Sequence, residues 1–188
     1  MIITPLEIIY LIVASLVVGY IFSGIIKSQA KEDVLKQYTR RFDWENFKLA
    51  VIVAAPGVII HELAHKFVAM GFGLNAIFQI WPTGLAIGVI LKLLGSPFLL
   101  VAPGYVSIGG GSGIFPFVLT AFAGPFTNLL LWIGAKMLSK HVKNASRKTA
   151  IALLLTENMN KWLFIFNMIP VPPLDGSKVL YPLFGALF

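Results

Sequence analysis

The sequence predicts an all-α membrane protein with about four transmembrane helices. Of its 188 residues, 57% are hydrophobic and only 12% are charged, whereas about 25% of the residues in a soluble domain are charged. Long apolar runs alternate with two basic segments, 27–48 and 136–148, which we interpret as juxtamembrane anchors. The net charge is +7, but the basic residues are not gathered on one folded face. We therefore expect the lipid bilayer, and not nucleic acid, as the basic residues' partner.

The first predicted span is Leu6–Ile26, an apolar run whose only charge is Glu7. Such a run is long enough to cross a hydrocarbon core of ~30 Å. No basic segment precedes it, which favours a span over a cleaved signal peptide. Residues 28–48 predict an amphipathic helix on the membrane surface, with a solvated linker as the alternative. We divide the chain into an N-terminal helix with its juxtamembrane segment, 1–48, and a membrane core, 49–188.

The second predicted span, 49–71, carries the sequence His-Glu-Leu-Ala-His at positions 61–65. Two histidines at i and i+4 lie on one face of a helix and can share one metal ion. Glu62, beside the first histidine, can take a proton from a water at that metal. Ionisable groups inside a membrane are costly and usually functional. Pro56 and Gly57 precede the motif by one turn and could kink the helix and open backbone groups toward the site.

Residues 74–112 allow two interpretations. Two apolar arms, 85–94 and 98–106, surround a turn signal at Gly95-Ser96-Pro97. They could form a re-entrant or interfacial hairpin or, merged, a single crossing helix. The glycine-rich stretch 109–113 lacks the Lys-Ser/Thr ending of a phosphate-binding loop, so we interpret it as a hinge.

Two further spans are predicted at 114–135, which contains no charged residue, and at about 149–169. Three prolines within residues 170–173 cannot continue a helix. The chain must therefore unwind there, and we expect Asp175 on irregular backbone. At membrane depth such backbone is tolerated where protein or a polar cavity surrounds it.

The acidic residues suggest which side chain completes a metal site. The chain has no cysteine, and a catalytic zinc needs three protein ligands with one position left open. After residue 45 the acidic residues are Glu62, Glu157 and Asp175. Glu157 has Lys161 at i+4, which favours an ordinary ion pair on a helix. Asp175 follows an apolar span among prolines and needs a counter-charge such as a metal. This favours Asp175, with Glu157 as the alternative.

Three motifs in this order resemble the signatures of site-2 proteases, which are intramembrane zinc metalloproteases. They are the His-Glu-Leu-Ala-His sequence, Ala-Gly-Pro-Phe-Thr-Asn at 123–128, and Asn-Met-Ile-Pro-Val-Pro-Pro-Leu-Asp-Gly at 167–176. The resemblance implies that residues 49–188 form the catalytic core, built around three helices. It also implies one Zn²⁺ per chain and assigns the following site residues: His61, His65 and Asp175 as metal ligands, Glu62 as general base, and Asn128 and Asn167 as holders of the substrate strand or the oxyanion.

The motifs also constrain the topology. His65 and Asp175 both lie near the trailing ends of their spans and must meet at one depth, so 74–112 should return to the side where it began. We therefore predict the hairpin, between the second and third spans, with edge strands that could pair with an unwound substrate. Charge bias makes the two basic segments cytoplasmic, whereas the resemblance implies that the end of the histidine helix is near the cytoplasm.

The function predicted from the sequence is peptide-bond hydrolysis in a transmembrane protein substrate, as in regulated intramembrane proteolysis. The enzyme would be a multi-pass protein of the plasma membrane. Two alternatives remain: a non-catalytic metal-binding scaffold, and a membrane metalloprotease of the prenyl-protein-processing kind with Glu157 as third ligand.

Overall fold

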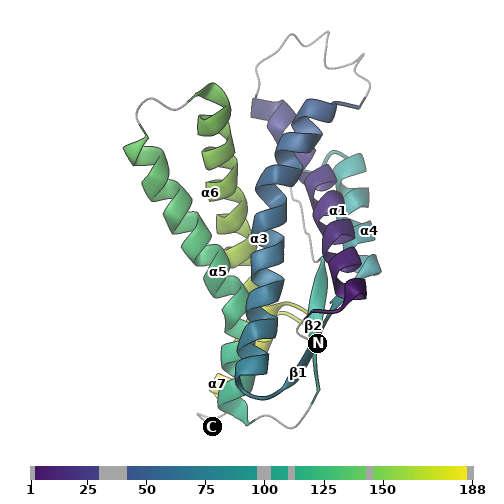
Figure 1. Cartoon of the computed structure of the whole chain (residues 1–188), viewed down its shortest axis with the longest axis vertical. Coiled ribbons are helices and arrows are strands. Elements are labelled where there is room, and N and C mark those ends of the chain that lie inside the picture. The colour runs from purple at the N-terminus through teal and green to yellow at the C-terminus, as the bar shows by residue number, and fades with distance from the viewer. Residues whose placement is uncertain (1–2, 30–41, 97–102, 110–112, 143–145, 186–188) are drawn as a thin grey trace.

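The computed structural model describes residues 3–29, 42–96, 103–109, 113–142 and 146–185. These residues form an α-helical protein with one small sheet, and Figure 1 shows α3 between α1 and α4 on one side and α5 and α6 on the other. The elements are α1 (Pro5–Gln29), α3 (Trp44–Gly71), β1 (Asn75–Ile80), α4 (Pro82–Leu93), β2 (Gly104–Gly109), α5 (Ile114–His141), α6 (Arg147–Asn167) and α7 (Asp175–Gly185). The predicted all-α fold class is confirmed.

Among the described residues, three helices are long and apolar enough to cross a membrane: α1 over Pro5–Ser23, α3, and α5. They indicate an integral membrane protein. The fourth predicted span corresponds to α6, which has 21 residues but carries the polar cluster from Thr156 to Lys161 and is less apolar. The number of four transmembrane helices stays a prediction.

Helix α1 begins with a reciprocal cap. The Thr4 backbone N–H donates to Glu7 Oε2 at 2.7 Å, and the Glu7 backbone N–H donates to Thr4 Oγ1 at 3.3 Å. This is the capping box of a Thr-x-x-Glu sequence, with Pro5 at the first helical position. The helix then packs closely on α3, because a Cβ at Gly19 would lie only 2.4 Å from the Val51 side chain.

The main hydrophobic core joins α1, α3, α4 and α6. Apart from Met159, its buried members are small or branched. They are Val18, Ala50, Val53, Ala54, Val58, Leu85, Leu155, Met159 and Leu163. The predicted division at residue 48 falls within α3. The part of segment 28–48 predicted as a surface helix lies largely outside the described residues, and Trp44–Lys48 belong to α3.

Helix α3 starts at an N-cap, Asp43, whose side chain accepts from the Asn46 N–H. It runs without interruption past Pro56 to Gly71. The kink and the opened backbone groups expected at Pro56 and Gly57 stay a prediction, and the Gly57 carbonyl accepts a hydrogen bond from Asn128 Nδ2 at 3.4 Å. That carbonyl therefore supports a side chain behind the histidines.

Residues 74–109 leave α3 and return to it as a strand–helix–strand unit. Strands β1 and β2 are antiparallel, with Asn75 opposite Gly109 and Ile80 opposite Gly104. The first predicted arm, 85–94, falls mostly in α4, and part of the second forms β2. Of the predicted turn at 95–97, the structure describes residues 95 and 96. Of the predicted hinge at 109–113, it describes residues 109 and 113. Entry of this unit into the bilayer stays a prediction.

Asp175 lies at the start of α7, so its predicted placement on irregular backbone is wrong. The prolines end α6 as expected, but only residues 168–174 separate it from the next helix. Gly176 makes this turn possible, because a Cβ there would lie 2.4 Å from the Met168 carbonyl oxygen. The new helix holds Asp175 on a more rigid element than a loop would.

The two ends of the molecule differ. The end of α1, the start of α3, the end of α5 and the start of α6 lie together, whereas the sheet and α7 lie at the opposite end (Figure 1). The helix ends that border both basic segments are therefore on one side. Which side faces the cytoplasm stays a prediction.

Candidate metal centre

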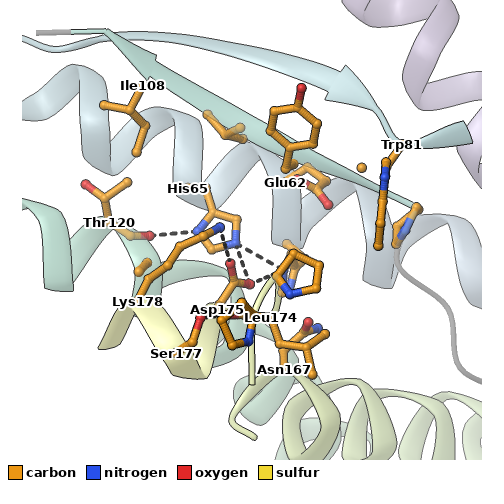
Figure 2. A pocket seen from close by; sticks show the side chains of 18 of the residues that line it. Glu62, His65, Trp81, Ile108, Thr120, Asn167, Leu174, Asp175, Ser177 and Lys178 are labelled. Carbon is orange, nitrogen blue, oxygen red and sulfur yellow. Dashed lines mark hydrogen bonds and ion pairs between the residues drawn. The ribbon is translucent and has the colours of Figure 1, made fainter. Parts of the chain in front are cut away.

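The two histidines of α3 face each other one turn apart. His61 and His65 are both buried, and their Nε2 atoms lie 3.1 Å apart. The spacing i, i+4 places both rings on the same side of the helix, which here is the side toward α5 and α7. Figure 2 shows His65 beside Asp175 in this arrangement.

Asp175 completes a group of three converging atoms. Its Oδ2 lies 3.1 Å from His65 Nε2 and 3.3 Å from His61 Nε2. A tetrahedral zinc with ligand bonds of about 2.0–2.1 Å holds neighbouring ligand atoms about 3.3 Å apart. The three separations fit one face of such a tetrahedron, which leaves the fourth position open.

The outer nitrogens of the two rings fix which atoms can bind a metal. His65 Nδ1 lies 2.7 Å from the Thr120 carbonyl oxygen, which can only accept, so Nδ1 carries the proton. His61 Nδ1 lies 2.5 Å from Asn128 Oδ1, which also can only accept, so this Nδ1 carries a proton too. In the neutral rings both Nε2 atoms therefore present lone pairs to each other and to the carboxylate. Three acceptors at this distance need a cation between them.

Asn128 is itself held from behind. Its Nδ2 donates to Asn160 Oδ1 at 2.8 Å, and Asn160 Nδ2 donates to the Thr156 carbonyl at 2.9 Å. Because the Thr156 carbonyl can only accept, the chain of donors fixes Asn128 Oδ1 toward His61. Both asparagines are completely buried. Helices α5 and α6 thus orient a ligand that belongs to α3.

Gly124 of α5 keeps open the space that an ion would fill. A Cβ at this position would lie 2.2 Å from His65 Nε2 and 2.6 Å from His61 Nε2. Any side chain here would enter the space between the ligands. This cradle and the set of three acceptors fit a bound metal.

Glu62 lies beside this group, on the wall of a cavity of about 520 Å³. The residue is buried, and its Oε2 has no hydrogen-bond partner among the described residues. A buried carboxylate oxygen without a partner is costly, and such atoms are concentrated where a substrate or water completes them. The cavity also has apolar walls from α3, α5, β2 and α6.

The structure separates the two asparagines that were predicted to hold substrate. Asn167 lines the cavity, facing the same space as Glu62. Asn128 lies behind His61, with both ends of its amide engaged in hydrogen bonds. In this position its amide orients a metal ligand, and it does not face the cavity.

The alternative third ligand lies away from the site. Among the described residues, the group that could hold a metal is His61, His65 and Asp175. Glu157 belongs to α6 and is not part of that group. His141 is exposed at the end of α5, as expected for a residue of the second basic segment.

Three residues that the sequence interpretation did not assign contribute to the centre. Thr120 supplies the carbonyl that orients His65, and Asn160 supports Asn128. Lys178 Nζ donates to Asp175 Oδ1 at 3.2 Å, which leaves Oδ2 for the imidazoles. Lys178 follows Asp175 by three residues, and this spacing predicts the contact if both residues belong to one helix.

Comparisons with known proteins show the family of the chain. The chain is 37% identical over 152 residues to "Putative zinc metalloprotease MJ0611" of Methanocaldococcus jannaschii, which covers 74% of this chain and 75% of that protein. The chain belongs to this family of zinc metalloproteases. It is also 29% identical over 149 residues to "Putative zinc metalloprotease YwhC" of Bacillus subtilis, covering 69% of this chain and 66% of that protein. No family model matches the chain, and no solved structure matches it.

We expect Gly124→Ala to lower metal affinity at least about tenfold, because the methyl group would fill the space between the ligands. Metal content of the purified metalloprotease, measured by mass spectrometry after dialysis, checks this. Gly134→Ala is the matched control, since a Cβ at Gly134 of the same helix meets nothing within 4 Å. Equal metal content in both variants would contradict the claim that Gly124 keeps open the space for the metal.

Replacing Asn128 by leucine should weaken metal binding about 10–100-fold, the usual loss when the outer partner of a histidine ligand is removed. Competition with a chromogenic chelator measures the affinity. The control is Asn158→Leu, because within the described residues the Asn158 amide donates to a carbonyl of its own helix and not to the metal centre. If Asn128→Leu binds metal like the parent, the assigned orientation of His61 is wrong.

Proposed function

We propose that this zinc metalloprotease hydrolyses a peptide bond within or near the transmembrane segment of a membrane protein. The observation that carries the proposal is the position of the metal group and Glu62. They are buried together between apolar helices that are long enough to span a bilayer. A peptide bond that reaches this cavity would be attacked in surroundings from which bulk water is largely excluded.

In this proposal one Zn²⁺ per chain is held by His61, His65 and Asp175. Nitrogen and carboxylate oxygen donors in this number are typical of catalytic zinc sites. When bound, zinc supplies a Lewis acid that polarises a carbonyl and acidifies a water. The hydrogen bonds that Thr120 and Asn128 accept from the two histidines, and the one that Lys178 donates to Asp175, keep the three ligand atoms directed at one place.

Glu62 is the proposed general base. Its buried Oε2 is unpaired within the described structure and lies on the cavity wall next to the ligands. It is therefore placed to accept the proton of an attacking water and to pass it to the leaving amine. Asn167, which lines the same cavity, is the proposed donor to the substrate strand or to the oxyanion.

Strand β2 is the proposed docking edge for the substrate. Four of its residues, Gly104, Tyr105, Val106 and Ile108, line the cavity, and Figure 2 shows the strand passing above Glu62 and His65. A helical substrate has its backbone hydrogen bonds satisfied, so it must unwind before it can pair with a strand. We therefore expect helix-breaking residues near the cleaved bond. Cleavage of this kind would be a step of regulated intramembrane proteolysis at the plasma membrane.

Glu62→Gln should keep its metal but lose cleavage by about 10²–10⁴-fold, the range for removal of a general base. The assay uses purified protein and a panel of tagged single-span substrates, with a chelator added in parallel. Unchanged cleavage by Glu62→Gln would contradict the assigned base. Cleavage that resists the chelator would contradict the metalloprotease itself.

The third ligand is tested by metal content. Asp175→Ala should lose zinc, because two imidazoles alone leave the site one protein ligand short. Glu157→Ala, a matched removal of a carboxylate on a neighbouring helix, should retain zinc in full. The reverse result would assign the third ligand to Glu157.

A further inference from the structure

Outside the metal centre, the described residues contain a buried ion pair that the proposed chemistry does not use. Glu7 of α1 and Lys66 of α3 are each 2% exposed, and Lys66 Nζ donates to Glu7 Oε1. Charges buried in apolar helices are costly and persist where a specific geometry is needed. The pair lies beside the metal centre in sequence, since Lys66 directly follows His65.

The same carboxylate oxygen also binds the sheet. The Phe78 backbone N–H of β1 donates to Glu7 Oε1 at 2.8 Å. Phe78 is itself buried, and a Cβ at Gly104 would meet its ring. Glu7 Oε1 thus joins three elements at one point: α1, the histidine helix α3, and β1.

This contact fixes β1 from its outer edge. Phe78 lies opposite Val106 of β2, and Val106 lines the cavity. Because the Phe78 N–H donates to Glu7, the edge of β1 that faces away from β2 has one of its donors occupied. A third strand would meet an occupied edge at β1, whereas no hydrogen bond within the described residues occupies the outer edge of β2 beside the cavity.

We propose that Glu7 is a positioning residue that fixes where the two-stranded sheet lies along the histidine helix, α3. Through β1 it determines where a strand bound to β2 lies relative to Glu62. The proposal rests on the proposed function for its effect on substrate, but the tether between Glu7 and β1 is a property of the chain alone.

The experiment compares two neutral double variants that differ in one acceptor. Glu7→Gln with Lys66→Met keeps one side-chain oxygen for the Phe78 N–H and the hydrogen bond from the residue 7 N–H to Thr4 Oγ1. The Thr4 N–H loses its acceptor, Glu7 Oε2, in both variants, so this half of the capping box does not distinguish them. Glu7→Leu with Lys66→Met has a similar volume but no acceptor. Both remove the buried charges, so neither leaves an unpaired ion.

We expect the leucine variant to raise KM for a single-span substrate about tenfold relative to the glutamine variant, with kcat and zinc content nearly equal. Hydrogen–deuterium exchange of residues 75–80 should be about tenfold faster in the leucine variant, because the Phe78 amide loses its acceptor. Equal KM and equal exchange would show that Glu7 only fills space. Loss of zinc in the leucine variant alone would show that it acts on the metal centre. Either result overturns the proposal.

Thr4→Val separates the sheet contact from the helix cap. It removes the hydroxyl that accepts from the Glu7 N–H and leaves Glu7 Oε1 untouched. We expect it to have parent-like KM and exchange, and a raised KM here would assign the effect to the cap. If the leucine variant does not fold, Glu7→Asn with Lys66→Met, whose amide is shorter by one methylene, makes the same comparison.

The exchange measurement also separates this proposal from the proposed function. If the parent protein cleaves no substrate, the proposed function fails. The exchange rates of β1 still decide whether Glu7 holds the sheet.

Discussion

Two imidazole nitrogens and one carboxylate oxygen lie within 3.3 Å of one another in the interior of this protein. All three present lone pairs, because the outer nitrogen of each ring is committed to an acceptor. Such an arrangement is repulsive unless a cation sits among them. The rest of the structure is organised around this constraint: α3 supplies two of the atoms, α7 supplies the third, and α5 supplies the space and the carbonyl behind one ring.

The support extends well beyond the ligands. A line of buried amides runs from His61 through Asn128 to Asn160, and so connects α3, α5 and α6. Inside apolar helices these amides have few other partners, so each one is fixed by the next. The centre is therefore held by a hydrogen-bonded network as well as by the fold.

The local sequence was sufficient to predict the three candidate ligands that the structure brings together. His61 and His65 follow from the period of the helix, and Asp175 was favoured because a lone carboxylate after an apolar span needs a counter-charge. The remaining features depend on contacts between distant elements. Asn128 was predicted to face the substrate, but its direction is decided by Asn160 on another helix. The start of α7 at Asp175 depends on Gly176 packing on the end of α6, which no local pattern reveals.

The same contrast applies to the N-terminal region. The Thr4–Glu7 cap could have been read from the sequence, whereas the meeting of Glu7 with Lys66 and Phe78 could not, because these residues are separated by 59 and 71 positions from Glu7. Pairings over such distances depend on how the helices cross. The sequence marked Glu7 only as the charged edge of a span.

The histidine pair is not centred in its helix. α3 runs from Trp44 to Gly71, so at 1.5 Å per residue His61 lies about 26 Å from one end and about 15 Å from the other. If the proposed function holds, a membrane substrate cut at this level would be divided unequally. Its longer fragment would keep enough apolar length to stay in the leaflet on the basic side, whereas the shorter fragment would be too short to remain anchored and would be released on the opposite side.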